Sequence, residues 1–338
     1  MNIDKLKLSA YISGILIFSS AQHIILPSLT IYYNSLYFIM LTSSIFGCVN
    51  YACILLYLKG WGIFTFPPRP YLILIIGFVN ALMSFCFIYS TNPERTPVII
   101  QSILLGFAII PTVIFRKYLL NKVIIYNFKI ITLSIILLLL SVILAIIPMI
   151  FVKINFSPWI IVYLVGVVLL SLDNALQEKF VSYFKDSKVT DKFTLAFYAS
   201  LIQLVIFICL FWVEAFFGYA STISEVWFLL KENYVLFFIK WDHCLFLLSF
   251  IYISLFLYIT SIYCNAISTN YNMILTNLTN QSVAIFYSIF PQLNNGYHTP
   301  ISYIILSLLL NIISIILWIN GEKNTIESDF YQNLDVLS

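Results

Sequence analysis

Charged residues are scarce in this chain of 338 residues: Asp, Glu, Lys and Arg make up 9% of it, against 62% for hydrophobic residues. Soluble domains carry about 25% charged residues. Together with a mean hydropathy of +0.99, this scarcity excludes an ordinary soluble domain and predicts an integral membrane protein. The net charge of +3 is explained by loops beside an anionic leaflet, so we expect no nucleic-acid partner.

Residues that build metal, redox and nucleophilic sites are also few. The chain has three histidines, His23, His243 and His298, which are too scattered to predict a metal cluster. Its six cysteines suggest no disulfide framework by their spacing. There is no glycine-rich phosphate loop with a following lysine, and no Ser, His and Asp arrangement with nucleophile spacing. We therefore expect no cofactor, no metal, no ATP-driven transport and no enzymatic activity.

Long hydrophobic runs are abundant. About 20 apolar residues cross the ~30 Å hydrocarbon core of a bilayer, and ten stretches of this kind leave no room for a soluble domain. The first stretch is too long for a cleavable signal and lacks a small-residue cleavage site, so we expect an anchor. The segment 221–242 is amphiphilic and predicts a short interfacial helix. The ten predicted spans are Leu8 to Thr30, Ser35 to Leu58, Pro70 to Thr91, Pro97 to Phe115, Phe128 to Ile150, Pro158 to Gln177, Phe193 to Phe216, Cys244 to Cys264, Tyr271 to Phe290 and Ile301 to Ile319.

Basic residues are distributed unequally between the two sides of these spans. With the N-terminus in the cytosol, 13 of the 17 lysines and arginines fall on the cytosolic side. The other four are Arg95, Lys153, Lys231 and Lys240. Positive residues favour the cytosolic side, so this distribution supports ten spans with both termini cytosolic.

Two short strings recur in the same order. Ser90-Thr91-Asn92 returns 178 residues later at position 268, and Gln101-Ser102 returns 180 residues later at position 281, each time with a proline ten positions after the glutamine. This pattern predicts a duplicated helix pair. The copies occupy spans three and four and spans eight and nine. An odd separation of five spans inverts the second copy, as in transporters with inverted repeats.

The predicted fold is therefore an all-α membrane protein of ten transmembrane helices in two inverted five-helix repeats. Residues 1–150 form the first repeat, residues 151–320 the second, and residues 321–338 a cytosolic polar tail. Spans five and ten have few polar side chains in their middles, so we expect them at the periphery, facing lipid. Spans one, two, three, four, six, seven and nine carry amides, a histidine or an acid, and such groups usually face a bundle interior or a wet cavity.

Eight of these polar residues are candidates for a central site. Amides between membrane helices often serve only as packing contacts, and this alternative applies to each of them. The pseudo-symmetric pair Gln101 and Gln281 favours a cavity. The candidate substrate-binding residues are Asn80, Gln101, Gln203, Asn277, Asn280 and Gln281. His23 and Asp173 are candidate proton-coupling groups, and Glu214, near the end of span seven, is expected to be solvated at the interface.

The residues from Gly77 to Pro111, with Asn80-Ala81, Ser90-Thr91-Asn92 and Ile100-Gln101-Ser102, resemble the chloroquine-resistance-transporter-like family of the drug/metabolite transporter superfamily. Residues 171–184 and 267–287 are similar to it as well. The resemblance implies a ten-helix inverted-repeat fold with a cavity built by spans one to four and six to nine. It also implies export of small cationic or zwitterionic solutes (amino acids, peptides, glutathione-like thiols or drugs), driven by a proton gradient or a membrane potential.

The function we expect is thus secondary active transport by alternating access, with a small molecule and the lipid bilayer as partners and protons as a candidate coupling ion. The protein is expected to be a monomer or homodimer. The resemblance favours the vacuolar or endolysosomal membrane, with a plastid membrane as the alternative. A nucleotide-sugar or triose-phosphate exchanger is less favoured because no lysine or arginine lies in the middle of a predicted span, Lys129 being at the edge of span five. A membrane receptor or assembly factor is the alternative from another class.

Overall fold

The computed structural model describes residues 3–64, 67, 69–120, 127–151, 157–184, 188–218, 220–267, 269–290 and 301–321. Helices dominate these residues, and none of them belongs to a strand. The predicted polar tail, apart from Gly321, lies outside the described residues. The helices are α1 (Ile3–Tyr32), α2 (Leu36–Lys59), α3 (Pro70–Ser90), α4 (Val98–Leu105), α5 (Ile109–Leu120), α6 (Phe128–Phe151), α7 (Trp159–Ser182), α8 (Val189–Cys209), α9 (Glu214–Phe217), α10 (Ile223–Ile239), α11 (Trp241–Ile267), α12 (Thr269–Ile289) and α13 (Ile301–Gly321).

The protein is an all-α, multi-pass membrane protein. Seven segments of the described chain are long and apolar enough to cross a membrane: Ala10–Tyr32, Leu36–Gly62, Pro70–Ser90, Ile100–Leu120, Trp159–Ser182, Val189–Cys209 and Trp241–Ile267. Each overlaps one of the ten predicted spans. The other three predicted spans coincide with α6, α12 and α13, of which α6 and α13 contain shorter apolar stretches.

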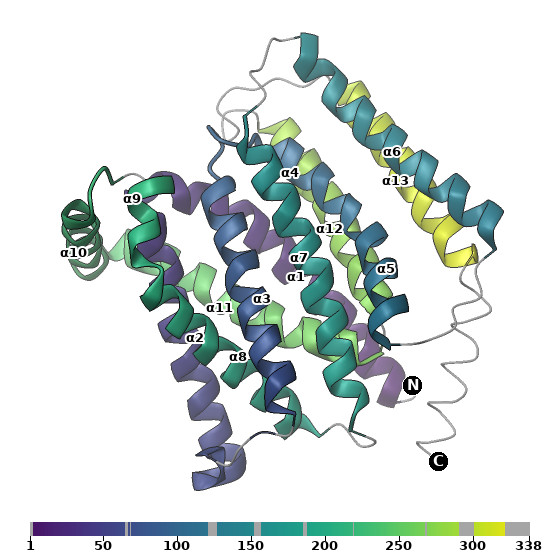
Figure 1. Cartoon of the computed structure of the whole chain (residues 1–338). Helices are drawn as coiled ribbons and strands as arrows, with labels where there is room; N and C mark the ends of the chain where they lie inside the picture. Colours follow the sequence, from purple (N-terminus) through teal and green to yellow (C-terminus); the bar gives the residue numbers. More distant parts are fainter. Residues whose placement is uncertain are drawn as a thin grey trace.

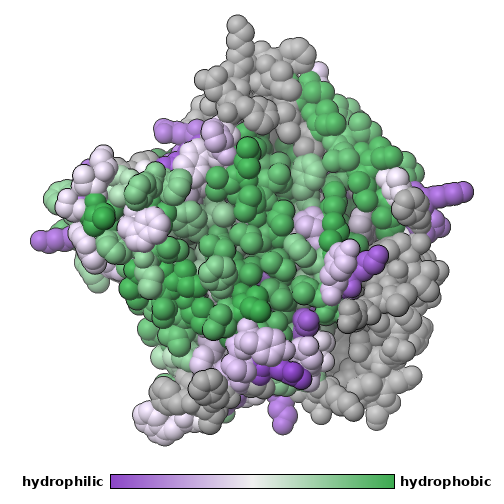
Figure 2. All heavy atoms as spheres, in the orientation of Figure 1, coloured by the Kyte–Doolittle hydropathy of each residue, from purple (hydrophilic) through white to green (hydrophobic). Residues whose placement is uncertain are grey.

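Large apolar side chains cover the outside of the bundle. Ile161 is 66% exposed, Ile17 63% and Leu74 60%, and Figure 2 shows a broad apolar surface over the middle of the molecule. In water such a surface would be strongly unfavourable, whereas in a bilayer it contacts lipid tails. The exposed surface therefore agrees with membrane insertion.

The helices pack in pairs that join the two halves of the chain. α6 lies along α13, at one edge of the bundle in Figure 1, and α2 lies along α8. α3 packs against α7 and α8, α1 against α11 and α12, and α4 against α12. The chain thus forms a single bundle in which first-half helices contact mostly second-half helices.

The predicted span boundaries were wrong at two charged residues. Span four continues beyond Phe115, because a 3-10 turn at Gly106–Ala108 leads into α5, which ends at Leu120. α8 begins at Val189 rather than at Phe193. As a result Arg116 and Lys192 lie inside helices, where they are 4% and 6% exposed. Each has a partner that offsets burial: Arg116 pairs with Glu178, and the Lys192 ammonium lies 4.7 Å from the ring centre of Tyr263.

The amphiphilic segment after α9 contains a helix, as the sequence predicts. α10 begins after Thr222, whose hydroxyl accepts a hydrogen bond from the Glu225 backbone N–H at 3.3 Å. Val226 and Leu230 on this helix are buried, whereas Phe228 and Phe238 are exposed. α10 therefore packs on the bundle by one face and leaves aromatic side chains on another.

Candidate functional site

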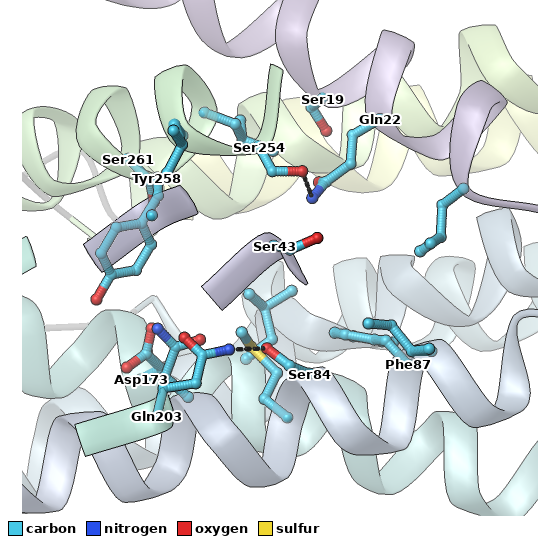
Figure 3. A pocket seen from close by; sticks show the side chains of 18 of the residues that line it. Ser19, Gln22, Ser43, Ser84, Phe87, Asp173, Gln203, Ser254, Tyr258 and Ser261 are labelled. Carbon is cyan, nitrogen blue, oxygen red and sulfur yellow. Dashed lines mark hydrogen bonds between the residues drawn. The ribbon is translucent and has the colours of Figure 1, made fainter. Parts of the chain in front are cut away.

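A cavity of about 250 Å³ lies inside the bundle. Its lining comes from α1, α2, α3 and α4 in the first half of the chain and from α7, α8, α11 and α12 in the second half. Among the described residues, α6 and α13 contribute nothing to it. Figure 3 shows amide, hydroxyl and carboxylate groups from several helices directed into this space. The cavity is thus polar and shared between both halves.

Five of the predicted site residues line the cavity: His23 on α1, Asn80 on α3, Gln101 on α4, Asp173 on α7 and Gln203 on α8. These residues are up to 180 positions apart in the sequence, between 23 and 203, and the fold brings them around one space. The polar character of their spans, taken from the sequence, therefore located side chains that share a cavity.

His23 and Gln203 have part of their hydrogen-bonding capacity left for a ligand. His23 Nδ1 lies 2.7 Å from the backbone carbonyl oxygen of Ser19. A carbonyl only accepts, so Nδ1 carries the proton and Nε2 remains for the cavity. Gln203 Nε2 donates to the Ser84 hydroxyl at 3.0 Å, as Figure 3 shows. These contacts orient both side chains without using all their donors and acceptors.

Gln101 has a structural task as well as a cavity position. Its Nε2 donates to the carbonyl oxygens of Thr91 at 2.8 Å and Thr96 at 2.6 Å. Both protons of the amide are thereby used to hold the turn between α3 and α4, which leaves Oε1 as the group available to a ligand. Gln101 can accept a hydrogen bond from a solute but has no free donor for it.

Three predicted site residues on α12 do not add to this picture. Asn277 is buried away from the cavity, where its amide exchanges hydrogen bonds with the amide of Asn311 on α13 at 3.2 and 3.3 Å. The structure therefore gives Asn277 a packing contact. The side chains of Asn280 and Gln281 lie outside the described part of the chain.

Asp173 lies deeper than the sequence indicates, because α7 extends to Ser182 instead of ending at Gln177. Its side chain is 2% exposed. Oδ2 accepts a hydrogen bond from Gln177 Nε2 at 2.7 Å. No lysine or arginine is among the described residues that line the cavity. The described wall of the cavity therefore holds a carboxylate without a lysine or arginine.

Sequence reasoning did not assign the amide network beside Asp173. Asn174 Oδ1 accepts from Asn265 Nδ2 at 2.6 Å and from Asn272 Nδ2 at 3.0 Å. Asn265 Nδ2 also donates to Gln177 Oε1 at 2.8 Å. The sequence gives a weak signal for this network, namely several amides near the ends of predicted spans six and eight. Their mutual contacts join α7, α11 and α12 and could not be read from spacing within one helix.

Glu214 was wrongly expected to be solvated. The residue is fully buried, and its carboxylate accepts hydrogen bonds from the backbone N–H groups of Leu36 and Tyr37, both at 3.1 Å, and from the Tyr89 hydroxyl at 2.5 Å. Leu36 and Tyr37 are the first residues of α2, where backbone donors have no partner within the helix and negative charge is favoured. The carboxylate is buried because it satisfies these donors.

A second buried glutamate lies on α7. Glu178 receives a two-point ion pair from Arg116, Nε to Oε2 at 2.9 Å and a terminal nitrogen to Oε1 at 3.0 Å. Its Oε2 also accepts from the backbone N–H of Thr269, the first residue of α12, at 3.1 Å. The ion pair joins α5 and α7 in the strong bidentate geometry, and the Thr269 hydrogen bond connects Glu178 to α12.

Comparison with known proteins gives a structural neighbour with a similar fold but no relative of described function. No family model matches the chain, and no curated protein matches it. A solved structure described only as the crystal structure of a protein is similar to it, with a TM-score of 0.54 and 9% sequence identity over 94% of this chain and 97% of that one. At this identity the likeness concerns the fold alone.

Proposed function

We propose that this protein is a secondary active transporter that moves small cationic or zwitterionic solutes across a membrane by alternating access. The observation that carries the proposal is the polar cavity, which is lined by four helices from each half of the chain and leaves α6 and α13 outside. A site between two halves is the arrangement in which rocking of one half against the other opens it to each side in turn.

The packing of the helices supports two inverted five-helix repeats. Exchanging the halves pairs α1 with α7, α2 with α8, α3 with α11, α4 and α5 with α12, and α6 with α13. Under this exchange the α3–α7 contact becomes the α11–α1 contact, and both are extensive. The contacts of α2 with α8, α4 with α12 and α6 with α13 map onto themselves. This relationship is the one expected of a pseudo-two-fold axis.

The composition of the cavity wall supports a solute that carries a positively charged group. Asp173 provides a carboxylate, whereas no lysine or arginine lines the cavity among the described residues. A sugar phosphate or nucleotide sugar requires a cation in its site, usually arginine or lysine. A solute with an ammonium or guanidinium group fits better. His23 and Asp173 are the candidates for coupling transport to protons.

Other parts of the proposal depend on sequence alone. We infer cytosolic termini from the distribution of basic residues, and the similarity of three segments to the chloroquine-resistance-transporter-like family is the basis for a vacuolar or endolysosomal location.

The test is uptake into proteoliposomes of a basic amino acid, a dipeptide, glutathione and a triose phosphate, with and without an imposed pH gradient. We expect gradient-dependent uptake of a cationic or zwitterionic solute. Gln203→Ala should reduce this uptake, since Gln203 lines the cavity. Asn277→Ala is the matched control, because its amide lies outside the cavity.

Two results would contradict the proposal. Exchange of triose phosphate independent of the gradient would favour a phosphate exchanger of the same superfamily. An absence of flux for every solute, from protein that remains folded in the vesicles, would favour a receptor or assembly factor.

A further inference from the structure

The two carboxylate oxygens of Asp173 have different surroundings. Oδ2 accepts a hydrogen bond from Gln177 at 2.7 Å. Oδ1 is equally buried, yet it has no hydrogen-bond partner among the described residues. Asp173 lines the cavity and is 2% exposed. A buried carboxylate oxygen without a partner is costly, so Oδ1 favours a ligand that brings a proton donor or a positive charge.

No charged side chain of the described chain supplies that partner. The ion pair found in these residues joins Arg116 and Glu178, and no lysine or arginine lies in the described lining of the cavity. A ligand in the cavity can therefore supply the partner of Asp173 Oδ1.

The amide network determines which oxygen faces the ligand. Asn265 donates both amide protons, one to Asn174 Oδ1 and one to Gln177 Oε1, while its own Oδ1 accepts from Asn272 at 2.9 Å. Because Gln177 Oε1 is the acceptor in this network, Gln177 Nε2 must point the other way and donate to Asp173 Oδ2. The network thereby holds the carboxylate in place and leaves Oδ1 open.

Two hydroxyl groups of the same cavity are also buried without a hydrogen-bond partner among the described residues, those of Tyr258 and Ser43. The Asn80 side chain contacts the Tyr258 hydroxyl, and Asp173 is near enough to interact with it electrostatically. Figure 3 shows it directed toward the side of the cavity on which Asp173 and Gln203 lie. A donor placed at Asp173 Oδ1 can therefore meet a second oxygen acceptor.

We propose that Asp173 Oδ1 and the Tyr258 hydroxyl bind a primary ammonium group of the solute, with Asp173 as the counter-ion. A primary ammonium has three N–H donors and no acceptor, which matches a site of open acceptor oxygens. This ammonium site depends on the proposed transport function in one respect only, namely that its ligand is the transported solute.

A metal cation fits this place less well. Hard divalent cations such as Ca²⁺ take about six to eight oxygen ligands, whereas Asp173 offers one open carboxylate oxygen. The cavity of about 250 Å³ is larger than a single ion needs and is walled in part by Leu26, Met83 and Phe87. These apolar groups suit the carbon skeleton of an organic ammonium compound.

The test measures equilibrium binding to the full-length protein in nanodiscs, followed by thermal unfolding. The probes are n-butylammonium, the uncharged n-butanol, tetramethylammonium and Na⁺. We expect n-butylammonium to stabilise the protein saturably and n-butanol to have no effect at the same concentration. Tetramethylammonium should bind more weakly, because it has the charge but no N–H donor.

Asp173→Asn removes the charge and keeps an oxygen that can accept from Gln177, so the amide network should persist. We expect it to weaken n-butylammonium binding about tenfold or more, since hydrogen bonds to charged groups are the strong ones. Tyr258→Phe should weaken binding to a smaller extent. Asp242→Asn is the matched control, because Asp242 is an exposed carboxylate at the start of α11, and it should bind as the unaltered protein does.

A second measurement needs no variant. A hydrophobic carbodiimide should label Asp173, and n-butylammonium should protect that residue when the labelled peptides are mapped. Unchanged binding in Asp173→Asn, no protection of Asp173, stronger stabilisation by Na⁺ than by n-butylammonium, or no saturable binding up to solubility would each overturn the ammonium site. Because binding requires no flux, its failure is distinguishable from failure of the transport proposal.

Discussion

Ser134 on α6 and Ser314 on α13 form reciprocal hydrogen bonds. The Ser134 hydroxyl donates to the Ser314 backbone carbonyl at 2.7 Å, and the Ser314 hydroxyl donates to the Ser134 carbonyl at 2.8 Å. The two residues are 180 positions apart, the same interval at which Gln101-Ser102 recurs at position 281. Residues that are equivalent under a two-fold exchange meet at the axis, so this contact supports the proposed duplication.

The flanking contacts obey the same exchange. On one side the Ser307 hydroxyl donates to the Ser141 carbonyl at 2.8 Å. On the other side the Asn127 backbone N–H donates to the Gly321 carbonyl at 3.2 Å. Adding 180 to 127 and 141 gives 307 and 321, so one contact is converted into the other. The contacts between α6 and α13 therefore have the symmetry that the proposed duplication requires, with Ser134 and Ser314 at its centre.

The first prediction concerns this axis. All six cysteines are free, so they can be replaced before new ones are introduced. In that background Ser134→Cys with Ser314→Cys should form a disulfide under mild oxidation, because the two hydroxyl oxygens lie 3.0 Å apart. Ser134→Cys with Leu309→Cys is the control, since Leu309 is 52% exposed on the outer surface. Gel mobility after proteolysis between the halves measures the crosslink, and equal yields for both pairs would contradict the arrangement.

The second prediction concerns Glu214. Glu214→Ala removes the acceptor for three donors and should lower the free energy of unfolding by about 3 kcal/mol, because buried donors are left unsatisfied. Glu214→Gln should cost less, since one amide oxygen still accepts. Thermal unfolding in detergent measures both variants.

Glu232→Gln is the control for Glu214, because Glu232 is exposed on α10 and should be neutral. Equal stability of Glu214→Ala and Glu232→Gln would show that the buried carboxylate adds nothing to the fold.

Much of the helical architecture was predictable because hydrophobic runs of about 20 residues have few other uses. The ends of the helices were not predictable, because a charged residue was interpreted as the boundary of a span. Arg116 is tolerated inside a helix because Glu178 pairs with it. Glu178 is 62 positions away in the sequence, so no local pattern identifies the pair. The burial of Glu214 was unpredictable for the same reason, because the backbone N–H groups that it accepts from on α2 are more than 170 residues away in the sequence.

The candidate site was predictable only as a set of polar positions in apolar helices. That signal located His23, Gln203 and Asp173 in the cavity. It applied equally to Asn277, which instead pairs with Asn311. Periodicity identifies the face of a helix but not the neighbour opposite that face, so it did not separate cavity residues from packing contacts.

The third prediction concerns the crossing of α3 and α8. A Cβ added at Gly77 would lie 2.7 Å from Ile202 Cβ and 3.1 Å from the Ala199 carbonyl oxygen. Gly77→Ala should therefore push the helices apart and destabilise the protein by about 1–3 kcal/mol. Gly62→Ala is the matched control, because the nearest atom to its added Cβ is 3.9 Å away. If thermal unfolding does not distinguish the two variants, the close crossing is absent in the membrane.

The fourth prediction concerns the buried ion pair between Arg116 and Glu178. Arg116→Leu leaves the Glu178 carboxylate without its counter-ion in the interior and should destabilise the protein by about 3–5 kcal/mol. Adding Glu178→Gln removes the stranded charge and keeps an oxygen that can accept from the Thr269 backbone N–H. The double variant should therefore be more stable than Arg116→Leu alone.

This reversal separates two explanations for the pair. If attraction within the pair dominated, each change would lose stability and the double variant would be the least stable of the three. If the cost of an unpaired buried charge dominates, the second change restores stability that the first removed. Unfolding measured for both single variants and the double variant decides between them, and a double variant below both singles would contradict the prediction. The pair joins helices of both halves, so its strength also limits how easily α5, α7 and α12 separate when the proposed transporter changes conformation.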